Sequence, residues 1–292
     1  MTQADFDSLV PPSDDFNRRR FVRSAVGGGF AAAVLPVMSQ TWVKTDDAGL
    51  TTGEVTVDVG GFQMPVYRAA PAGRTGLPVV LVVSEIFGVH EYIADVARRW
   101  AKAGYLAIAP ELFARQGDPQ SYGEVAKILS EIVDKTPDAQ VMGDLDACLN
   151  WAATQGANTS RSAITGFCWG GRITWLYAAH SPLVKAAVAW YGRLVGTATP
   201  HSPQHPVDVA AALQAPVLGL YGGSDTGIAL STVEQMKAAL GRGGAAAQKS
   251  QFVVYPEAPH AFHADYRPTY RQAAAQDGWQ RALAWVKEHG VA

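Results

Sequence analysis

Apolar and polar positions follow two different patterns along the chain. Residues 54–59 and 63–68 alternate between apolar and polar side chains on either side of Gly60 and Gly61, which is the pattern of a β-hairpin with one buried face. Further along, several short runs are almost continuously apolar, as expected for strands that are covered on both faces of a sheet. These runs are residues 78–83, 105–109, 162–165, 184–190, 216–221 and 251–255.

Between these runs, apolar residues recur at the three- and four-residue spacing of amphipathic helices. Strands that alternate with helices predict an α/β fold, with a mainly parallel, twisted sheet, helices on both faces and an N-terminal β-hairpin. In such a sheet, functional side chains gather at the carboxyl ends of the strands. The predicted helices cover residues 93–101, 123–135, 138–154, 172–179, 228–240 and 270–288, and the predicted loops cover 196–210 and 256–267.

The first 45 residues do not share this pattern. Twin arginines at positions 18 and 19 precede Phe21 and a weakly apolar run at 24–38, which is short for a membrane span. This combination indicates a Tat-type export signal. We therefore expect residues 1–45 to be signal and linker, residues 46–292 to form one domain, and the Tat machinery to export the protein to the periplasm or the extracellular space. A disordered basic tail and an uncleaved membrane-anchoring signal are the alternatives.

Composition changes this picture little. The chain has 292 residues, of which 48% are hydrophobic and 17% charged, and its formal net charge is −2. One sizeable globular domain is therefore expected, and a nucleic-acid partner is not. The two cysteines, Cys148 and Cys168, are too few for a disulfide framework. A single disulfide between them is an alternative, although one lies in a predicted helix and the other after a predicted strand.

Cys168 lies in the most informative stretch of the sequence, Gly-Phe-Cys-Trp-Gly-Gly at residues 166–171. A predicted strand, a Gly-x-Cys-x-Gly turn and a predicted helix follow one another here, which indicates a nucleophile elbow with Cys in the place of Ser. The glycines allow a sharp and crowded turn, and the helix N-terminus favours a thiolate at Cys168. A buried cysteine without chemistry is the alternative.

Two further strand ends supply the partners that such a thiol needs. Asp225 follows the strand at 216–221, and His260 follows the strand at 251–255. His260 would take the thiol proton, and Asp225 would hold the other imidazole nitrogen. The order nucleophile, acid, base along the chain is that of a known hydrolase triad. Two alternatives remain at this stage, namely His263 as the base and Asp225 as a residue that only shapes a turn.

A tetrahedral oxyanion would need two backbone N–H donors. The residue after the nucleophile, Trp169, supplies one, and Ile86 in the loop after the first central strand supplies the other. Phe87, Tyr191 and Trp169 are expected to line a small apolar pocket.

Glu85 is a carboxylate at the end of a predicted buried strand, where it needs a partner. It could accept the thiol proton, or repel the thiolate and keep the cysteine at rest. A simple ion pair with an arginine such as Arg115 is the third possibility.

The pairs His201/His205 and His260/His263 could suggest a metal. No further ligands converge with them in the sequence, so we expect no metal and no cofactor.

Five stretches together resemble the dienelactone hydrolase (carboxymethylenebutenolidase) family of α/β-hydrolases. The resemblance spans about residues 54–290, and the ordered set of stretches is more specific than any one of them. They are Glu-Ile-Phe-Gly at 85–88, Glu-Leu-Phe-Ala-Arg at 111–115, the elbow at 166–171, Gly-Gly-Ser-Asp at 222–225 and Tyr-Pro-Glu-Ala-Pro-His-Ala-Phe at 255–262.

The resemblance implies an α/β-hydrolase fold, a Cys-His-Asp triad at 168, 260 and 225, and a thiol-modulating Glu85. It also implies that Arg115 contacts a substrate carboxylate. Family members that act on dienelactone carry a hydroxyl and a second arginine just after the histidine. Here the matching residues are Ala261 and Ala264, and Arg267 comes three positions late. The substrate could therefore differ from dienelactone.

From these residues we expect a cofactor-independent hydrolase of small-molecule esters or lactones that works through an acyl-enzyme on Cys168. A secreted binding protein of the same fold without turnover is one alternative. A peptidase or acyltransferase that uses the same triad is the other.

Overall fold

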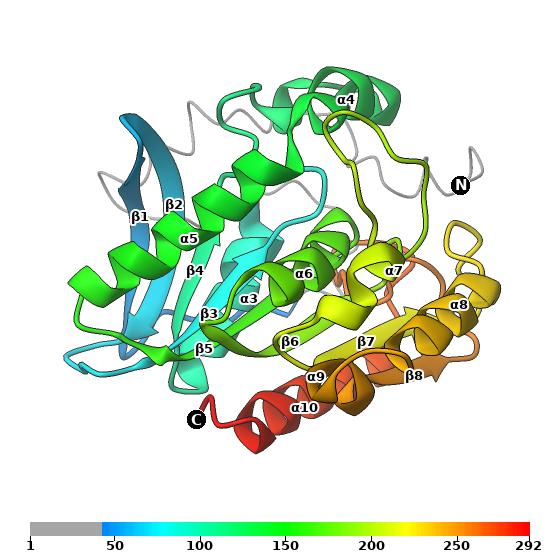
Figure 1. Cartoon of the computed structure of the whole chain (residues 1–292). Coiled ribbons are helices and arrows are strands. Elements are labelled where there is room, and N and C mark those ends of the chain that lie inside the picture. The colour runs from blue at the N-terminus through cyan, green and yellow to red at the C-terminus, as the bar shows by residue number, and fades with distance from the viewer. Residues whose placement is uncertain (1–42) are drawn as a thin grey trace.

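The computed structural model describes residues 43–292, which form one eight-stranded sheet flanked by helices (Figure 1). The strand order is β1-β2-β4-β3-β5-β6-β7-β8. β1 (Leu50–Val59) and β2 (Phe62–Pro71) form the predicted antiparallel hairpin, and β2 also pairs antiparallel with β4 (Leu106–Pro110). All other neighbours pair in parallel.

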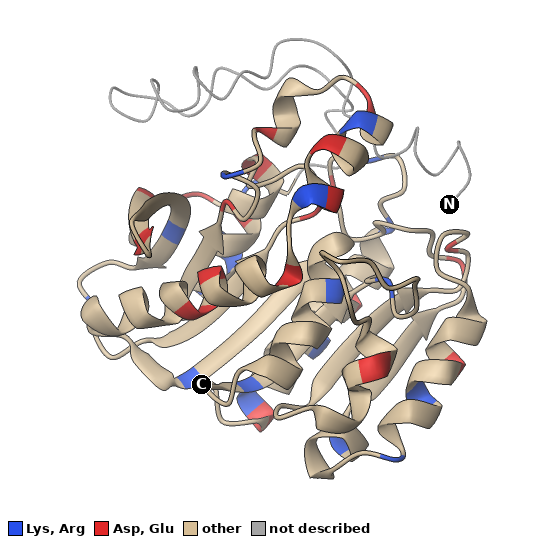
Figure 2. Ribbon diagram, turned by 45° about the horizontal axis from the view of Figure 1, so that its top comes forward, with Lys and Arg blue, Asp and Glu red and all other residues tan. Residues whose placement is uncertain are grey.

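The remaining strands are the predicted apolar runs, lengthened or shifted by a few residues at most ends. Parallel strands covered on both faces must be apolar throughout, and β3, β4 and β7 are buried at every position. Figure 2 shows that charged residues lie mainly on helices and loops rather than in the middle of the sheet. The bounds are β3 Pro78–Val83, β5 Asn158–Phe167, β6 Val184–Trp190, β7 Val217–Gly222 and β8 Gln251–Tyr255.

Helices cover both faces of the sheet. α3 (Glu91–Lys102) and α10 (Gln272–Glu288) are neighbours, with the Trp100 and Trp279 rings 4.9 Å apart. α5 (Asp138–Thr154) and α6 (Trp169–His180) pack side by side and lie in front of the sheet in Figure 1, with α3 behind it. The remaining helices are α4 Val125–Glu131, α7 Pro206–Val209, α8 Leu230–Leu240 and α9 Ala245–Lys249.

Three local expectations were wrong. The single helix predicted at 123–135 ends at Glu131, and after Ile132 (φ −118°, ψ −66°) a separate 3₁₀ turn covers Val133–Lys135. The predicted loop 196–210 contains α7, which begins with Pro206 at its first position, a residue well suited to a helix start. α9 was not predicted at all.

One continuous core fills the space between the sheet and its helices, and Trp100, Trp175 and Trp190 are fully buried within it. A small second cluster joins Ile86 and Phe87, after β3, to Val125 and Ile128 of α4. α4 therefore packs over the carboxyl end of the sheet. Within residues 43–292, no helix is long and apolar enough to cross a membrane.

Candidate active site

Cys168 stands at the tip of the turn between β5 and α6, as the elbow pattern predicts. Its φ of 54° and ψ of −112° are unusual for a residue with a side chain. A Cβ on Gly166 would lie 2.2 Å from the Gly170 carbonyl oxygen, and one on Gly170 would lie 2.4 Å from the Val83 carbonyl oxygen. Neither contact is possible for a side chain, so both glycines are needed to form this turn.

Asp225 and His260 meet at the same edge of the sheet. Asp225 Oδ2 lies 2.7 Å from His260 Nδ1, and both residues are buried. Asp225 Oδ1 accepts hydrogen bonds from the backbone N–H groups of Gly227 (2.9 Å) and Ile228 (3.0 Å). The carboxylate is thus held on one oxygen by the loop, and the other oxygen orients the imidazole.

The second nitrogen of His260 is available for chemistry. Nε2 is buried and makes no hydrogen bond within the described part of the chain. Burial alone would lower the pKa of His260, but the negative charge of Cys168 and the hydrogen bond with Asp225 outweigh it and raise that pKa above its ordinary value. Cys168 and Asp225 therefore both favour the protonated form of the His260 imidazole.

His263 occupies a different environment from His260. Its Nδ1 lies 2.6 Å from the Tyr92 hydroxyl, and its ring packs 4.4 Å from the Trp190 ring. Burial and the nearby charge of Arg99 hold the pKa of His263 well below its usual range. The imidazole that contacts Asp225 is therefore that of His260.

Glu85 is 1% exposed and anchors a polar cluster beside Cys168. Its Oε2 accepts a hydrogen bond from the Tyr266 hydroxyl (2.7 Å), and it lies 3.3 Å from His90 Nε2 and 3.6 Å from Arg267 Nη2. Burial would raise the pKa of Glu85, but the charges and hydrogen bonds of Arg267, His90 and Tyr266 bring it down to about 2. This carboxylate is therefore ionised at neutral pH.

The arginine beside Glu85 is thus Arg267 and not Arg115, the candidate considered from the sequence. Arg115 Nη1 donates to Asp144 Oδ2 at 2.7 Å, and its guanidinium carbon lies 4.2 Å from the centre of the Phe62 ring. Sequence reasoning missed His90, Tyr266 and Arg267 as partners of Glu85. The only signal was proximity in sequence, since His90 follows Glu85 by five residues and the other two follow His260 closely.

Two backbone N–H groups face no protein acceptor at this edge. Trp169 is the first residue of α6, where an N–H has no partner within the helix. Within residues 43–292, neither the Trp169 N–H nor the Ile86 N–H donates a hydrogen bond outside regular elements. Both are thus free to hold an oxyanion.

Aromatic side chains surround the site. Phe87 is buried, and the Arg267 guanidinium lies 5.0 Å from the centre of its ring. Trp169 packs against Phe113 with the ring centres 4.5 Å apart. Tyr191 is fully buried with a strained φ of 38°, and its ring stands edge-on to His260 at 5.1 Å. The Tyr191 hydroxyl has no hydrogen-bond partner within the described residues.

The two cysteines are both free thiols, so the alternative of a disulfide was wrong. Cys148 is fully buried in α5, and burial raises the pKa of its thiol far above the ordinary value. Only Cys168 is partly exposed.

The two histidine pairs are occupied by other contacts. His201 Nδ1 lies 2.7 Å from the Asp134 carbonyl oxygen, and His205 contacts Arg172 and the Thr197 carbonyl oxygen. Among residues 43–292, no three His, Cys, Asp or Glu side chains converge in a way that could hold a metal ion.

Comparison with known proteins places this geometry in context. The model of the dienelactone hydrolase family matches residues 64–290. A candidate carboxymethylenebutenolidase of Methylorubrum extorquens is 56% identical over 290 residues, covering 99% of this chain and 98% of the relative. One from Escherichia coli K12 is 54% identical over 263 residues, covering 90% of this chain and 96% of the relative. The crystal structure of a candidate dienelactone hydrolase from Klebsiella pneumoniae is 56% identical and superimposes with a TM-score of 0.79, covering 82% of this chain and 99% of that one.

Proposed function

The chain belongs to the dienelactone hydrolase family and is a hydrolase of carboxylic ester or lactone bonds, and from this premise we propose that it works through Cys168, His260 and Asp225. The observation that carries the proposal is the 2.7 Å contact between Asp225 and His260, with a free, buried Nε2 beside the elbow thiol. Three strand ends far apart in the sequence supply these groups.

In the first step, the Cys168 thiol gives its proton to His260 Nε2, and the sulfur forms a bond to the substrate carbonyl carbon. The carbonyl oxygen becomes an oxyanion and accepts hydrogen bonds from the N–H groups of Trp169 and Ile86. When the carbon–oxygen bond to the leaving group breaks, His260 returns the proton to the leaving alkoxide. A thioester on Cys168 remains, and for a lactone both parts of the product stay in one molecule.

In the second step, His260 takes a proton from a water molecule as that water attacks the thioester carbonyl. The same two N–H groups hold the second oxyanion. Breakage of the carbon–sulfur bond releases the acid, and the proton on His260 returns to the sulfur. Asp225 keeps the imidazole oriented through both steps, because its carboxylate is itself held by Gly227 and Ile228.

Glu85 acts in this proposal as a fixed negative charge that modulates the thiol. With a pKa of about 2 it is a poor proton acceptor at neutral pH. Its charge is balanced by Arg267, so the loss of that partner would change the electrostatic field at Cys168.

Substrate binding involves Phe87, Tyr191 and Trp169 as the aromatic walls of the site. The family resemblance assigns a substrate carboxylate to Arg115. Since the Arg115 guanidinium also holds Asp144 and stacks on Phe62, a substrate carboxylate would share that guanidinium. Its side chain is 24% exposed, so such sharing is sterically open. We therefore keep acidic esters and lactones as the substrate class, without a commitment to dienelactone.

The proposal is tested by Cys168→Ala, assayed with p-nitrophenyl acetate and a small lactone. We expect kcat/KM to fall by at least about 10³-fold, because the covalent route is lost. Cys148→Ala is the matched control, since it removes the other, fully buried thiol, and its kcat/KM should stay within about twofold of wild type. Full activity in the Cys168 variant would rule out the thiol as nucleophile.

A further inference from the structure

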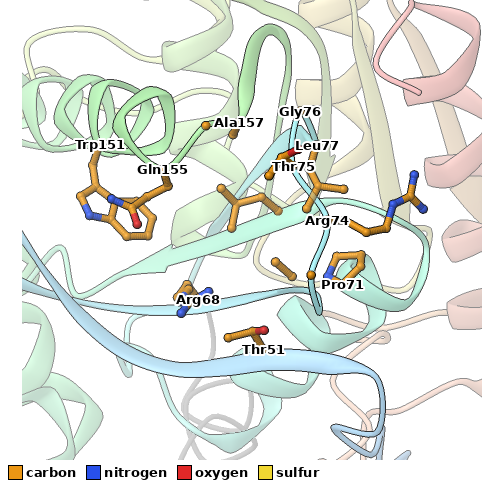
Figure 3. Close-up of a pocket in the computed structure, with 14 residues that line it drawn as sticks. Thr51, Arg68, Pro71, Arg74, Thr75, Gly76, Leu77, Trp151, Gln155 and Ala157 are labelled. Carbon is orange, nitrogen blue, oxygen red and sulfur yellow. The ribbon is translucent and has the colours of Figure 1, made fainter.

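A pocket lies at the opposite end of the sheet from Cys168. It has a volume of ≈ 130 Å³ and is bounded by β1, β2, the loop before β3 and the end of α5. Figure 3 shows the side chains that surround it, with Trp151 and Gln155 on one side, Pro71 and Arg74 on the other, and Thr51 and Arg68 below.

The pocket is separate from the hydrolytic site. Its lining residue Ala157 immediately precedes β5, whereas Cys168 immediately follows β5. A strand rises about 3.3 Å per residue, so the two ends of this ten-residue strand lie roughly 35 Å apart with the flanking residues included. A ligand in this pocket would not touch the reacting groups.

The charge of the pocket has one sign. Among its fourteen lining residues, Arg68 and Arg74 are the only charged side chains, and neither Asp nor Glu is present. Arg161 Nη2 donates to the Gly76 carbonyl oxygen at 2.9 Å, which brings a third guanidinium to the rim.

Arg68 differs from most arginines of the domain in having no partner. Within residues 43–292 no ion pair, hydrogen bond or ring contact is made by its side chain, although the residue is half-buried. Arg98, Arg99 and Arg172, by contrast, each contact at least one carboxylate. An anion in the pocket would give this guanidinium the counter-charge that it lacks within residues 43–292.

Strand geometry directs Arg68 into the pocket. Arg68 and Ala70 are two residues apart on β2 and share one face of the sheet, and both line the pocket. Thr51 pairs with Ala70 across the hairpin. The position of the guanidinium is therefore set by a strand paired on both sides and not by a mobile loop.

We propose that this pocket binds a small oxyanion, a phosphate or carboxylate group, with Arg68 as its main ligand and Arg74 as a second positive group at the rim. The planar guanidinium fork matches either group with two parallel hydrogen bonds. The volume is below the roughly 300–1,000 Å³ of pockets for drug-sized ligands, so a compact anion fits and a large cofactor does not.

The test is a calorimetric titration of the full-length protein with inorganic phosphate and, separately, with succinate, at constant ionic strength set by chloride. We expect saturable binding of at least one anion, and the tighter one identifies the preferred group. In Arg68→Gln the affinity should fall at least about tenfold. Arg242→Gln removes the same charge from an exposed arginine outside the pocket and should bind as wild type does.

Hydrolysis of p-nitrophenyl acetate reports on folding and should be the same in all variants. If Arg68→Gln does not fold, Arg74→Gln decides, because that side chain is exposed and its loss should weaken binding about threefold. The proposal is overturned if neither anion saturates the wild type. It is also overturned if the pocket variants bind as tightly as Arg242→Gln.

Discussion

At the scale of single residues, the site depends on buried charges that stabilise each other. Asp225 and His260 make a short contact, and Glu85 forms an ion pair with Arg267 and lies within hydrogen-bond distance of His90. Residue type and position at strand ends were enough to propose Asp225 and His260 as partners. The partners of Glu85 were not predictable. The positions of His90, Tyr266 and Arg267 depend on the conformations of the loops after β3 and β8, which the sequence pattern does not specify.

Replacement of Asp225 tests the orienting role. Asp225→Asn should lower kcat by about 10³- to 10⁴-fold for an activated ester, because an amide no longer favours the needed tautomer or stabilises an imidazolium. Asp277→Asn is a matched control at an exposed carboxylate paired with Arg281, and its kcat should be unchanged. Similar kcat values in the two variants would contradict the role of Asp225.

Glu85 makes stability depend on pH in acid. The pKa of Glu85 is about 2 in the folded protein, against an ordinary value of 4.5, so its stabilising contribution is complete above about pH 4.5 and is lost as the pH falls towards 2. The shift corresponds to roughly 3 kcal/mol. Urea unfolding of wild type and Glu85→Gln from pH 3 to pH 7 should give a shallower pH dependence for the variant, and parallel curves would refute this.

At the scale of elements, the elbow at residues 166–171 joins β5 to α6 through a turn in which backbone atoms approach each other very closely. The sequence pattern predicted the strand, the turn and the helix, because glycines at fixed offsets are required by the close approach of backbones. The position of α4 over the carboxyl end of the sheet was less predictable from the sequence. Its apolar residues Val125 and Ile128 pack on Ile86 and Phe87 after β3, with Trp169 against the same cluster, and these contacts join residues far apart in the chain.

Two glycine substitutions separate local propensity from tertiary contact. Gly170→Ala places a Cβ 2.4 Å from a backbone oxygen of β3, so we expect a loss of about 3 kcal/mol or more in the free energy of unfolding. Gly143→Ala lies within α5 and meets nothing within 4 Å, so it should gain about 0.5–1 kcal/mol. Denaturant unfolding measures both, and equal effects would contradict the steric argument.

At the scale of the whole molecule, the two proposed sites lie at opposite ends of the strands of one sheet. The proposed catalytic residues lie at the carboxyl ends of parallel strands, and the pocket that contains Arg68 lies at the amino ends of β3 and β5. The Tat-type signal and the export of the protein concern residues outside the described part of the chain and stay predictions.

Export is tested in the cell. Replacement of the twin arginines at positions 18 and 19 by lysine should retain the protein in the cytoplasm, because the Tat machinery reads the arginine pair. Esterase activity in periplasmic and cytoplasmic fractions is the measurement. Lysine replacement of Arg23, another basic residue of the same segment, is the control and should leave export unchanged. Equal fractions for wild type and the twin-lysine variant would remove the basis for the signal.

The sequence by itself determined the fold class, most of the strands and the family. Apolar periodicity and glycine spacing are local properties that can be read from the order of the residues alone. It also placed the elbow at residues 166–171. Only the tertiary structure decided which charged side chains form ion pairs with each other. It paired Glu85 with Arg267 and placed Arg115 on Asp144. It also left Arg68 in a pocket without a counter-charge. Such contacts join residues far apart in the chain, and their distances follow from how the sheet and helices pack.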